Sequence, residues 1–234
     1  MDEVKFVDTT FRDGHASLWA EGMTTGMMLP VAPLMGRIGF EAMELIATSH
    51  FKKAVRELKE DPWERIRLIS QKIPHIPLAL MMHPSVTAFD VTPFSVLKLW
   101  MERIAANGIK RVQLMEASND MTNRIDYTVE FAKNAGLQTV LAIVYSVSPK
   151  HTDEYFAQKA REVAGLKPDI IYLKDPGGLL TPERVRTLLP VIQDNIGNIP
   201  LELHSHCTTG LAPLVYLEAI KLGVRTVHTA IPPL

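Results

Sequence analysis

Short apolar segments recur along the chain, and each has the length and composition of a buried β-strand. They are residues 4–8, 42–46, 76–82, 111–116, 139–145, 169–174, 199–204 and 225–231. Most are apolar almost throughout instead of alternating with polar residues, which is typical of parallel strands covered on both faces. The pattern therefore predicts eight parallel strands separated by helices.

The stretches between these segments carry signals for helix ends. Asp61-Pro62 and Thr181-Pro182 each place an N-cap residue before a proline at the first helical position. Gly108, Gly136 and Gly223 each stand just before a predicted strand, as expected for the residue that follows a helix C-terminus. Eight evenly spaced βα units without a glycine-rich phosphate turn favour a (β/α)8 TIM barrel, with a doubly wound open sheet as the alternative.

The C-terminal end of the chain departs from a complete barrel. The last predicted strand is followed only by residues 232–234, so the eighth helix is absent from this chain. A barrel without that helix exposes apolar surface on its first and last strands. We therefore expect residues 1–234 to form a single barrel domain, the N-terminal part of a longer protein.

Composition narrows the class of protein without revealing its chemistry. The 234 residues are 47% hydrophobic and 22% charged, with a net charge of −1, which gives no electrostatic reason to expect binding to nucleic acid or to an anionic membrane. The single cysteine, Cys207, cannot form an internal disulfide. The charged N-terminus does not resemble a signal peptide, and no apolar run is long enough to span a bilayer, so we expect a cytoplasmic protein.

Polar residues follow several predicted strands, at the end where (β/α)8 enzymes carry out chemistry. His204 and His206 are two residues apart at the end of a strand, so their imidazoles point to the same side and suit a metal ion. Asp13 follows the first strand and would add an oxygen ligand. Such a set leaves coordination positions open for water or substrate, as a catalytic divalent ion requires.

Lys174 follows four apolar strand residues, which would carry it into the mouth of the barrel. Its amine could form a Schiff base with a carbonyl substrate, or it could add carbon dioxide and become an anionic carbamate ligand. The nearby histidine pair favours the carbamate. Gly177 and Gly178, just beyond, would let the backbone approach a ligand closely.

These segments resemble the carboxyltransferase domain of biotin-dependent carboxylases and decarboxylases, such as pyruvate carboxylase and the oxaloacetate decarboxylase α-subunit. That domain belongs to a metal-dependent barrel superfamily that includes 3-hydroxy-3-methylglutaryl-CoA lyase and isopropylmalate synthase. The resemblance covers nearly the whole chain. It rests on residues 8–15 with 17–20, 60–65, 173–175 with 178–180, and 204–210.

The resemblance implies a ligand set and a reaction. Asp13, carbamylated Lys174, His204 and His206 would bind a divalent zinc, manganese or magnesium ion, and Arg12 would hold a carboxylate or enolate oxygen of the substrate. Arg12 and Lys174 would thus be the catalytic residues. The reaction would pass carbon dioxide between carboxybiotin, carried by a partner domain or subunit, and a small α-keto acid through a metal-stabilised enolate. We also expect a homo-oligomer or a subunit of a complex.

The chain departs from the family pattern where substrate binds. Ala16 stands where the family usually has glutamine, and His83 stands near the usual arginine at the end of the third strand. His83, Asn119 and Asp175 join Arg12 as candidate substrate-binding residues. These departures keep one alternative open, a metal-dependent carbon–carbon lyase or aldolase of the same superfamily without biotin. The missing eighth helix keeps open a second, a non-catalytic truncated subunit of a larger complex.

Overall fold

The computed structural model describes residues 3–83, 92–122 and 124–231. Eight strands in this part of the chain pair in sequence order to form a closed parallel barrel, which confirms the predicted fold class. They are β1 (Lys5–Asp8), β2 (Ala42–Ala47), β3 (Leu78–Met82), β4 (Ile109–Leu114), β5 (Gln138–Val144), β6 (Ile170–Asp175), β7 (Leu201–Ser205) and β8 (Thr226–Thr229). Residues 232–234, on which the absence of an eighth helix was predicted, lie outside the described residues.

Helices connect successive strands of the barrel. The longer ones are α5 (Pro62–Lys72), α6 (Phe94–Ala106), α7 (Ile125–Asn134), α8 (Asp153–Gly165), α9 (Pro182–Ile196) and α10 (Ala212–Lys221). Shorter helices follow β1 and β2. They are α1 (His15–Leu18), α2 (Thr25–Met28), α3 (Ala32–Met35) and α4 (Thr48–Lys53), with the π-helical turns η1 (Thr10–Gly14) and η2 (Ala54–Leu58).

The predicted N-caps are present. The Asp61 carboxylate accepts a hydrogen bond from the backbone N–H of Trp63 at 2.9 Å, and the Thr181 hydroxyl accepts one from the N–H of Arg184 at 3.1 Å. Each cap satisfies one of the backbone donors left open at a helix start. β4 begins two residues earlier than predicted, because Gly108, at φ +119°, ends the turn after α6 and lets Ile109 enter the sheet at once.

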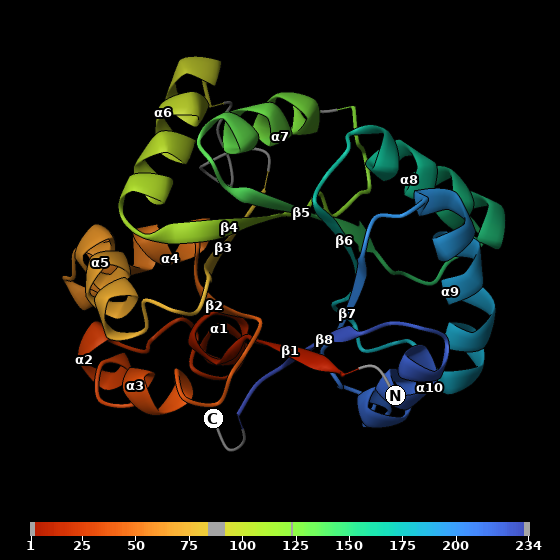
Figure 1. The fold of residues 1–234 in the computed structure, drawn as a ribbon, viewed down its shortest axis with the longest axis horizontal. Coiled ribbons are helices and arrows are strands. Elements are labelled where there is room, and N and C mark those ends of the chain that lie inside the picture. Colours follow the sequence, from red (N-terminus) through yellow and green to blue (C-terminus); the bar gives the residue numbers. More distant parts are fainter. Residues whose placement is uncertain (1–2, 84–91, 123, 232–234) are drawn as a thin grey trace. The chain divides into compact units, whose positions relative to one another are not determined.

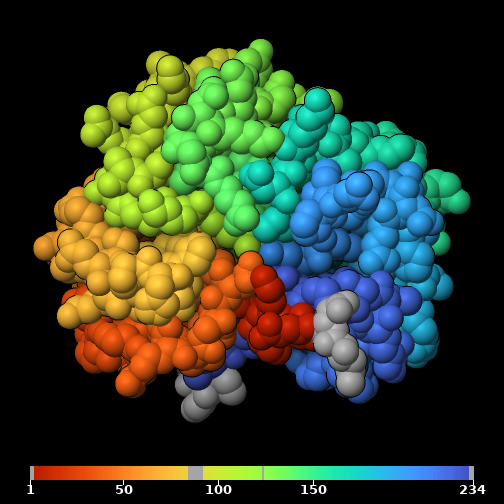
Figure 2. Space-filling model, in the orientation of Figure 1, coloured from red at the N-terminus to blue at the C-terminus, as the bar shows by residue number. Residues whose placement is uncertain are grey.

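The backbone contacts divide the chain into two compact units, which are described separately. Unit 1 comprises Met1–Lys5, Leu114–Val129 and Thr139–His228, and unit 2 comprises Phe6–Gln113, Glu130–Gln138 and Thr229–Leu234. In unit 1, α8 packs against α9 and α9 against α10, and α10 contacts β7 (Figure 1). Figure 2 shows the side chains of these helices as neighbouring parts of one surface.

The strands of unit 1 pair in a register that decides which side chains share a face. Val144, Lys174 and His204 are level with one another on β5, β6 and β7. One layer below, Ala142, Tyr172 and Glu202 are level. Partners in register on parallel strands face the same side of the sheet. The apolar members of this face form a buried cluster of Val140, Ala142, Val144, Ile170 and Tyr172.

A buried arginine organises the helices of unit 2. The guanidinium of Arg65, on α5, donates to the Glu60 carboxylate at 2.7 Å, to the Thr25 hydroxyl at 2.9 Å and to the Met23 carbonyl at 3.1 Å. Glu60 in turn accepts from the backbone N–H of Thr25 at 3.0 Å. These bonds fasten the start of α2 to α5. The segment of residues 60–65 therefore has a structural role, in which it connects α5 to the start of α2.

None of the helices in the described residues combines the length and the apolar character that crossing a bilayer requires.

The N-cap of α9 gives a direct test of how the helix starts are stabilised. Replacing Thr181 by alanine leaves the N–H of Arg184 without its side-chain acceptor and should lower the free energy of unfolding by about 1 kcal/mol. Chemical denaturation monitored by circular dichroism measures this. Thr187→Ala is the matched control, since Thr187 is exposed inside the same helix and alanine favours helices. Equal losses in the two variants would contradict the assigned cap.

Candidate functional site

In unit 1, Lys174 and His204 meet at the carboxyl ends of β6 and β7. The apolar run that precedes Lys174 fills the strand, so the register brings the lysine level with His204. The Nζ atom of Lys174 lies 2.8 Å from Nε2 of His204, and both residues are only 4% exposed. Lys174 therefore differs from a solvated surface lysine. A titratable amine that is buried against an imidazole is a candidate for a functional site.

His206 lies two residues beyond His204, on the same side of the chain as the period of a strand predicts. The two rings are 5.1 Å apart between centroids and inclined at 54°. A nitrogen of each lies within 4.8 Å of one on the other. The backbone N–H of His206 donates to the carbonyl of Asp175 at 3.1 Å, which ties this turn to the end of β6. Two imidazoles at this separation can share one metal ion.

Two further buried residues extend the hydrogen bonds of His204. Its Nδ1 atom lies 3.1 Å from Nδ1 of His228, on β8, and Nε2 of His228 lies 2.9 Å from a carboxylate oxygen of Glu202, on β7. The Tyr172 ring stacks on His228 at 5.6 Å with an interplanar angle of 8°. Glu202 was not among the site residues predicted from the sequence, although its position two residues before His204 places it on the same face.

Asp175 has structural partners in unit 1. It is fully buried, and its two carboxylate oxygens accept hydrogen bonds from the backbone N–H groups of Leu179 and Leu180 at 2.9 and 3.0 Å and from the Ser205 hydroxyl at 2.9 Å. Asp175 therefore holds the loop after β6 against β7. Its predicted contact with substrate stays a prediction.

The glycines after Asp175 allow the loop after β6 to pack closely against the loop after β7. Gly178 has φ +61°, and a Cβ atom there would lie 2.6 Å from the backbone nitrogen of Thr208. The Thr209 hydroxyl donates to the Gly178 carbonyl at 2.7 Å. The close approach predicted at this glycine is thus made to the loop that follows β7, where we had expected a ligand.

Asn119 clamps the end of β5 in unit 1. Its amide donates to the Val144 carbonyl at 2.8 Å and accepts from the Val144 N–H at 2.7 Å, so it imitates a neighbouring strand. It also donates to the Tyr155 hydroxyl at 3.2 Å. The side chain is 1% exposed, and the residue adopts a positive φ of 56°. These contacts position β5, and the predicted role of Asn119 toward substrate remains untested.

Unit 2 supplies the predicted residues Arg12 and Asp13. Both lie on η1, directly after β1, and Arg12 is buried. The Arg12 guanidinium forms an ion pair with Glu44, on β2, and contacts the Asp13 carboxylate at 3.1 Å. Glu44 is fully buried within an otherwise apolar strand, and it was not among the site residues predicted from the sequence. Two carboxylates hold the orientation of Arg12.

A second buried carboxyl group of unit 2 lies on β1. The Asp8 side chain accepts hydrogen bonds from the Thr10 hydroxyl at 2.6 Å and from the Thr10 N–H at 3.2 Å. Burial raises the pKa of Asp8 to about 7, and the negative charge of Glu44 acts in the same direction. Asp8 therefore exchanges its proton near neutral pH.

Two histidines of unit 2 are buried together, and neither was predicted as a site residue from the sequence. The rings of His15, on α1, and His50, on α4, meet edge to face with centroids 4.7 Å apart. Burial lowers the pKa of His15 to about 4, and the charges of Arg65 and Arg12 add to this. Burial also lowers the pKa of His50 to about 2, with contributions from His15 and Arg12. Both imidazoles are thus neutral at physiological pH.

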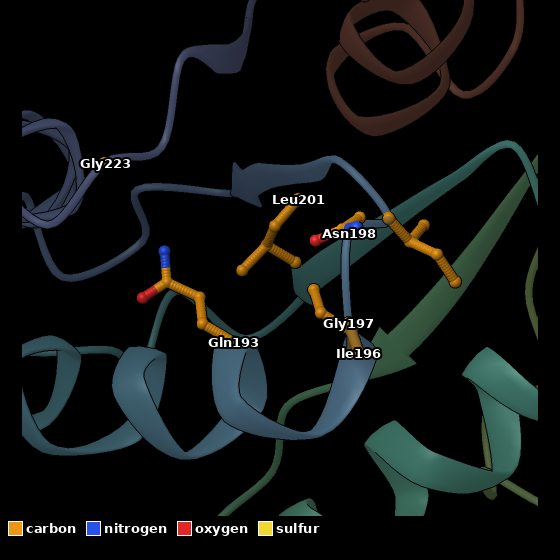
Figure 3. A pocket seen from close by; sticks show the side chains of 7 residues that line it. Gln193, Ile196, Gly197, Asn198, Leu201 and Gly223 are labelled. Atoms are coloured by element: carbon orange, nitrogen blue, oxygen red, sulfur yellow. The ribbon is translucent and has the colours of Figure 1, made fainter.

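The remaining predicted residue, His83, follows β3 in unit 2 and is partly buried. A pocket of about 290 Å³ in unit 1 lies elsewhere, between the end of α9, the start of β7 and the loop before β8 (Figure 3). Gln193 and Leu201 are among its lining residues. This pocket is at the amino ends of the strands, so it is separate from Lys174 and His204.

Comparison with known proteins gives consistent matches. A family model described as HMGL-like matches residues 3–232. A pyruvate carboxylase subunit of Methanocaldococcus jannaschii is 36% identical over 98% of this chain and 40% of the relative. The methylmalonyl-CoA carboxyltransferase 5S subunit of Propionibacterium freudenreichii subsp. shermanii is 29% identical over 98% of this chain and 46% of the relative.

Solved structures agree with the sequence relatives. The carboxyl transferase domain from Rhizobium etli pyruvate carboxylase superimposes with a TM-score of 0.91 at 27% identity, covering 99% of this chain and 40% of that chain. The same domain with pyruvate and biocytin gives a TM-score of 0.91 and covers 98% of this chain. The chain spans less than half the length of these relatives.

The buried histidines predict how stability depends on pH. Below the ordinary histidine pKa of 6.5 the unfolded chain takes up a proton at His50 that the folded chain does not, so stability falls on acidification. In His50→Gln, the fall between about pH 6 and about pH 5 should be shallower by up to ~1.4 kcal/mol per pH unit. Urea denaturation at each pH measures this slope.

The effect of His50 on the pH dependence of stability has to be obtained by comparing variants, because Asp8 changes stability with pH in the opposite direction. Its raised pKa keeps a proton on the folded chain that the unfolded chain has lost between pH 3.8 and about 7, so it favours folding as the pH falls through this range. Ser49→Ala, beside His50, removes no titrating group and should keep the wild-type slope. An unchanged slope in His50→Gln would refute the neutral buried imidazole.

Proposed function

The chain belongs to the HMGL-like family, and from this we propose that it is the carboxyltransferase barrel of a biotin-dependent carboxylase or decarboxylase. The relatives named as pyruvate carboxylase and carboxyltransferase subunits support this reaction class. In the proposal, a carboxyl group passes between carboxybiotin and a small α-keto acid. The carboxybiotin is delivered by a carrier domain or partner subunit.

The observation that carries the proposal is the donor set at the carboxyl ends of β6 and β7. Lys174, His204 and His206 bring an amine and two imidazoles together. Asp13, on η1 after β1, is the oxygen donor of the predicted ligand set. We assign these four residues as ligands of a divalent ion, because mixed nitrogen and oxygen donors suit zinc and manganese and are tolerated by magnesium.

Lys174 completes the set as a carbamate. Its uncharged amine attacks carbon dioxide, a nitrogen–carbon bond forms, and one proton leaves the nitrogen, which gives an anionic oxygen donor. The buried position of the amine favours its uncharged form and so favours this addition.

The other residues of the proposal bind and orient substrate. When present, the divalent ion supplies positive charge that favours the enolate of the keto acid. Arg12 binds a carboxylate or enolate oxygen, and its ion pairs with Glu44 and Asp13 keep the guanidinium from rotating away. His83 and Ala16 stand where the family usually has larger or charged groups, so they adjust the fit to the keto acid.

The ligand assignment predicts the effect of removing an imidazole. Either His204→Ala or His206→Ala should lower the bound metal, measured by elemental analysis of the purified full-length protein, and reduce carboxyl transfer at least 100-fold. Dialysis against a chelator should abolish transfer, and zinc or manganese should restore it. His75→Gln, at the amino end of β3, is the matched control and should retain metal and activity.

The same assay separates the two reaction classes. Turnover of the keto acid that requires carboxybiotin supports carboxyl transfer. Metal-dependent cleavage of a carbon–carbon bond without carboxybiotin would identify a lyase instead, an outcome that Ala16 and His83 make worth testing. Full activity in a chelator-treated sample would refute both.

The carbamate has its own spectroscopic test. Incubation with 13C-labelled bicarbonate should give a carbamate carbon resonance in the wild-type protein and none in Lys174→Gln. Acidification should remove the signal, because carbamates lose carbon dioxide when protonated. A wild-type spectrum without this resonance, taken under conditions of full activity, would exclude the carbamate while leaving the histidine ligands in place.

A further inference from the structure

We propose that Glu202 and His228 form a hydrogen-bonded relay that fixes the tautomer and the orientation of His204, so that its Nε2 atom presents a lone pair to the metal ion. The inference rests on the proposed metal site. It assigns a positioning role to two buried residues that do not belong to the ligand set.

The carboxylate end of the relay sets the direction of its hydrogen bonds. An ionised Glu202 only accepts, so the atom 2.9 Å away, Nε2 of His228, is the donor. In a singly protonated His228 the other ring nitrogen, Nδ1, is then an acceptor. Its partner at 3.1 Å, Nδ1 of His204, must carry a hydrogen and donate it. The Nε2 atom of His204 is left with a lone pair.

The lysine end is compatible with this assignment. The Nζ atom of Lys174 lies 2.8 Å from Nε2 of His204, and an amine has an N–H to donate to that lone pair in either charge state. The contact with Lys174 and the contact with Glu202 therefore fit one arrangement of hydrogens.

The surroundings hold this arrangement in place. Glu202 is 2% exposed and His228 is 3% exposed, so water does not compete for their hydrogen bonds. The Tyr172 ring lies nearly parallel to His228 and limits its rotation. The relay also spans β7 and β8, whose pairing starts at Glu202 and Thr226. Outer partners of this kind orient metal-binding histidines and raise their basicity.

The relay predicts a loss of metal affinity on neutral substitution. Glu202→Gln keeps the size of the side chain but lets an amide N–H face His228, which permits the opposite tautomer. Cobalt titration of the full-length protein, followed by its visible absorption, should show binding about 10- to 100-fold weaker than wild type. Asp169→Asn is the matched control, because Asp169 is a hydrogen-bonded carboxylate before the other end of β6. It should bind cobalt like wild type.

A paired substitution at His228 separates positioning from packing. In His228→Asn the amide oxygen can accept from Nδ1–H of His204, whereas in His228→Phe the ring fills the space without an acceptor. The asparagine variant should therefore retain more cobalt affinity than the phenylalanine variant. Equal affinities in the two variants would show that His228 acts only by filling space.

Nitrogen-15 NMR of the metal-free protein reads the tautomer directly. Long-range correlations should show His204 protonated at Nδ1 in the wild type and shifted toward Nε2 protonation in Glu202→Gln, with His204→Ala identifying the signals. An unchanged tautomer together with unchanged cobalt affinity would overturn the relay. A wild-type protein that binds no cobalt but keeps the Nδ1 tautomer would instead overturn the metal site, so the two failures are distinguishable.

Discussion

The pairing register of β5, β6 and β7 is the constraint on which the site in unit 1 depends. It sets Lys174 level with His204 and Tyr172 level with Glu202. Because side chains alternate between faces, a slip of one residue on β7 would turn both His204 and Glu202 away from Lys174. Such a slip would break the buried contacts of His204 with Lys174 and of Glu202 with His228, which therefore oppose it.

Both units give their buried ionisable side chains close polar partners. Arg12 forms an ion pair with Glu44 and Arg65 with Glu60, and Glu202 has a hydrogen-bond partner in His228. An isolated charge in the interior is costly, so each pair favours one arrangement of its elements over others. In unit 2, burial together with the nearby arginine charges lowers the pKa of His15 and of His50, so both imidazoles stay neutral. The contacts that hold these buried polar side chains in place therefore also orient the residues of the proposed site.

The sequence was sufficient for the architecture because the parallel-strand pattern is local and repetitive. It also predicted that Lys174, His204 and His206 lie close together at strand ends, as they do in the structure; their role as metal ligands stays a proposal. It could not reveal the relay through His228, which depends on pairing between strands that are 20 or more residues apart. Glu44 and Glu202 could have been predicted as site residues from the sequence, because an acidic residue inside an apolar strand needs a polar partner. The local roles of Asn119 and Asp175 depend on the conformations of the segments they hold, which no local sequence pattern specifies.

The contrast between Lys174 and its neighbour Asp175 has a consequence for how such a site diversifies. Adjacent strand residues face opposite ways, so Lys174 serves the interior while Asp175 fastens the loop after β6 through Leu179, Leu180 and Ser205. The proposed chemical role and the structural role thus belong to two separate residues at one strand end. A substitution at position 174 can change the reaction while Asp175 keeps the loop in place, so the substrate can change during evolution without loss of the fold.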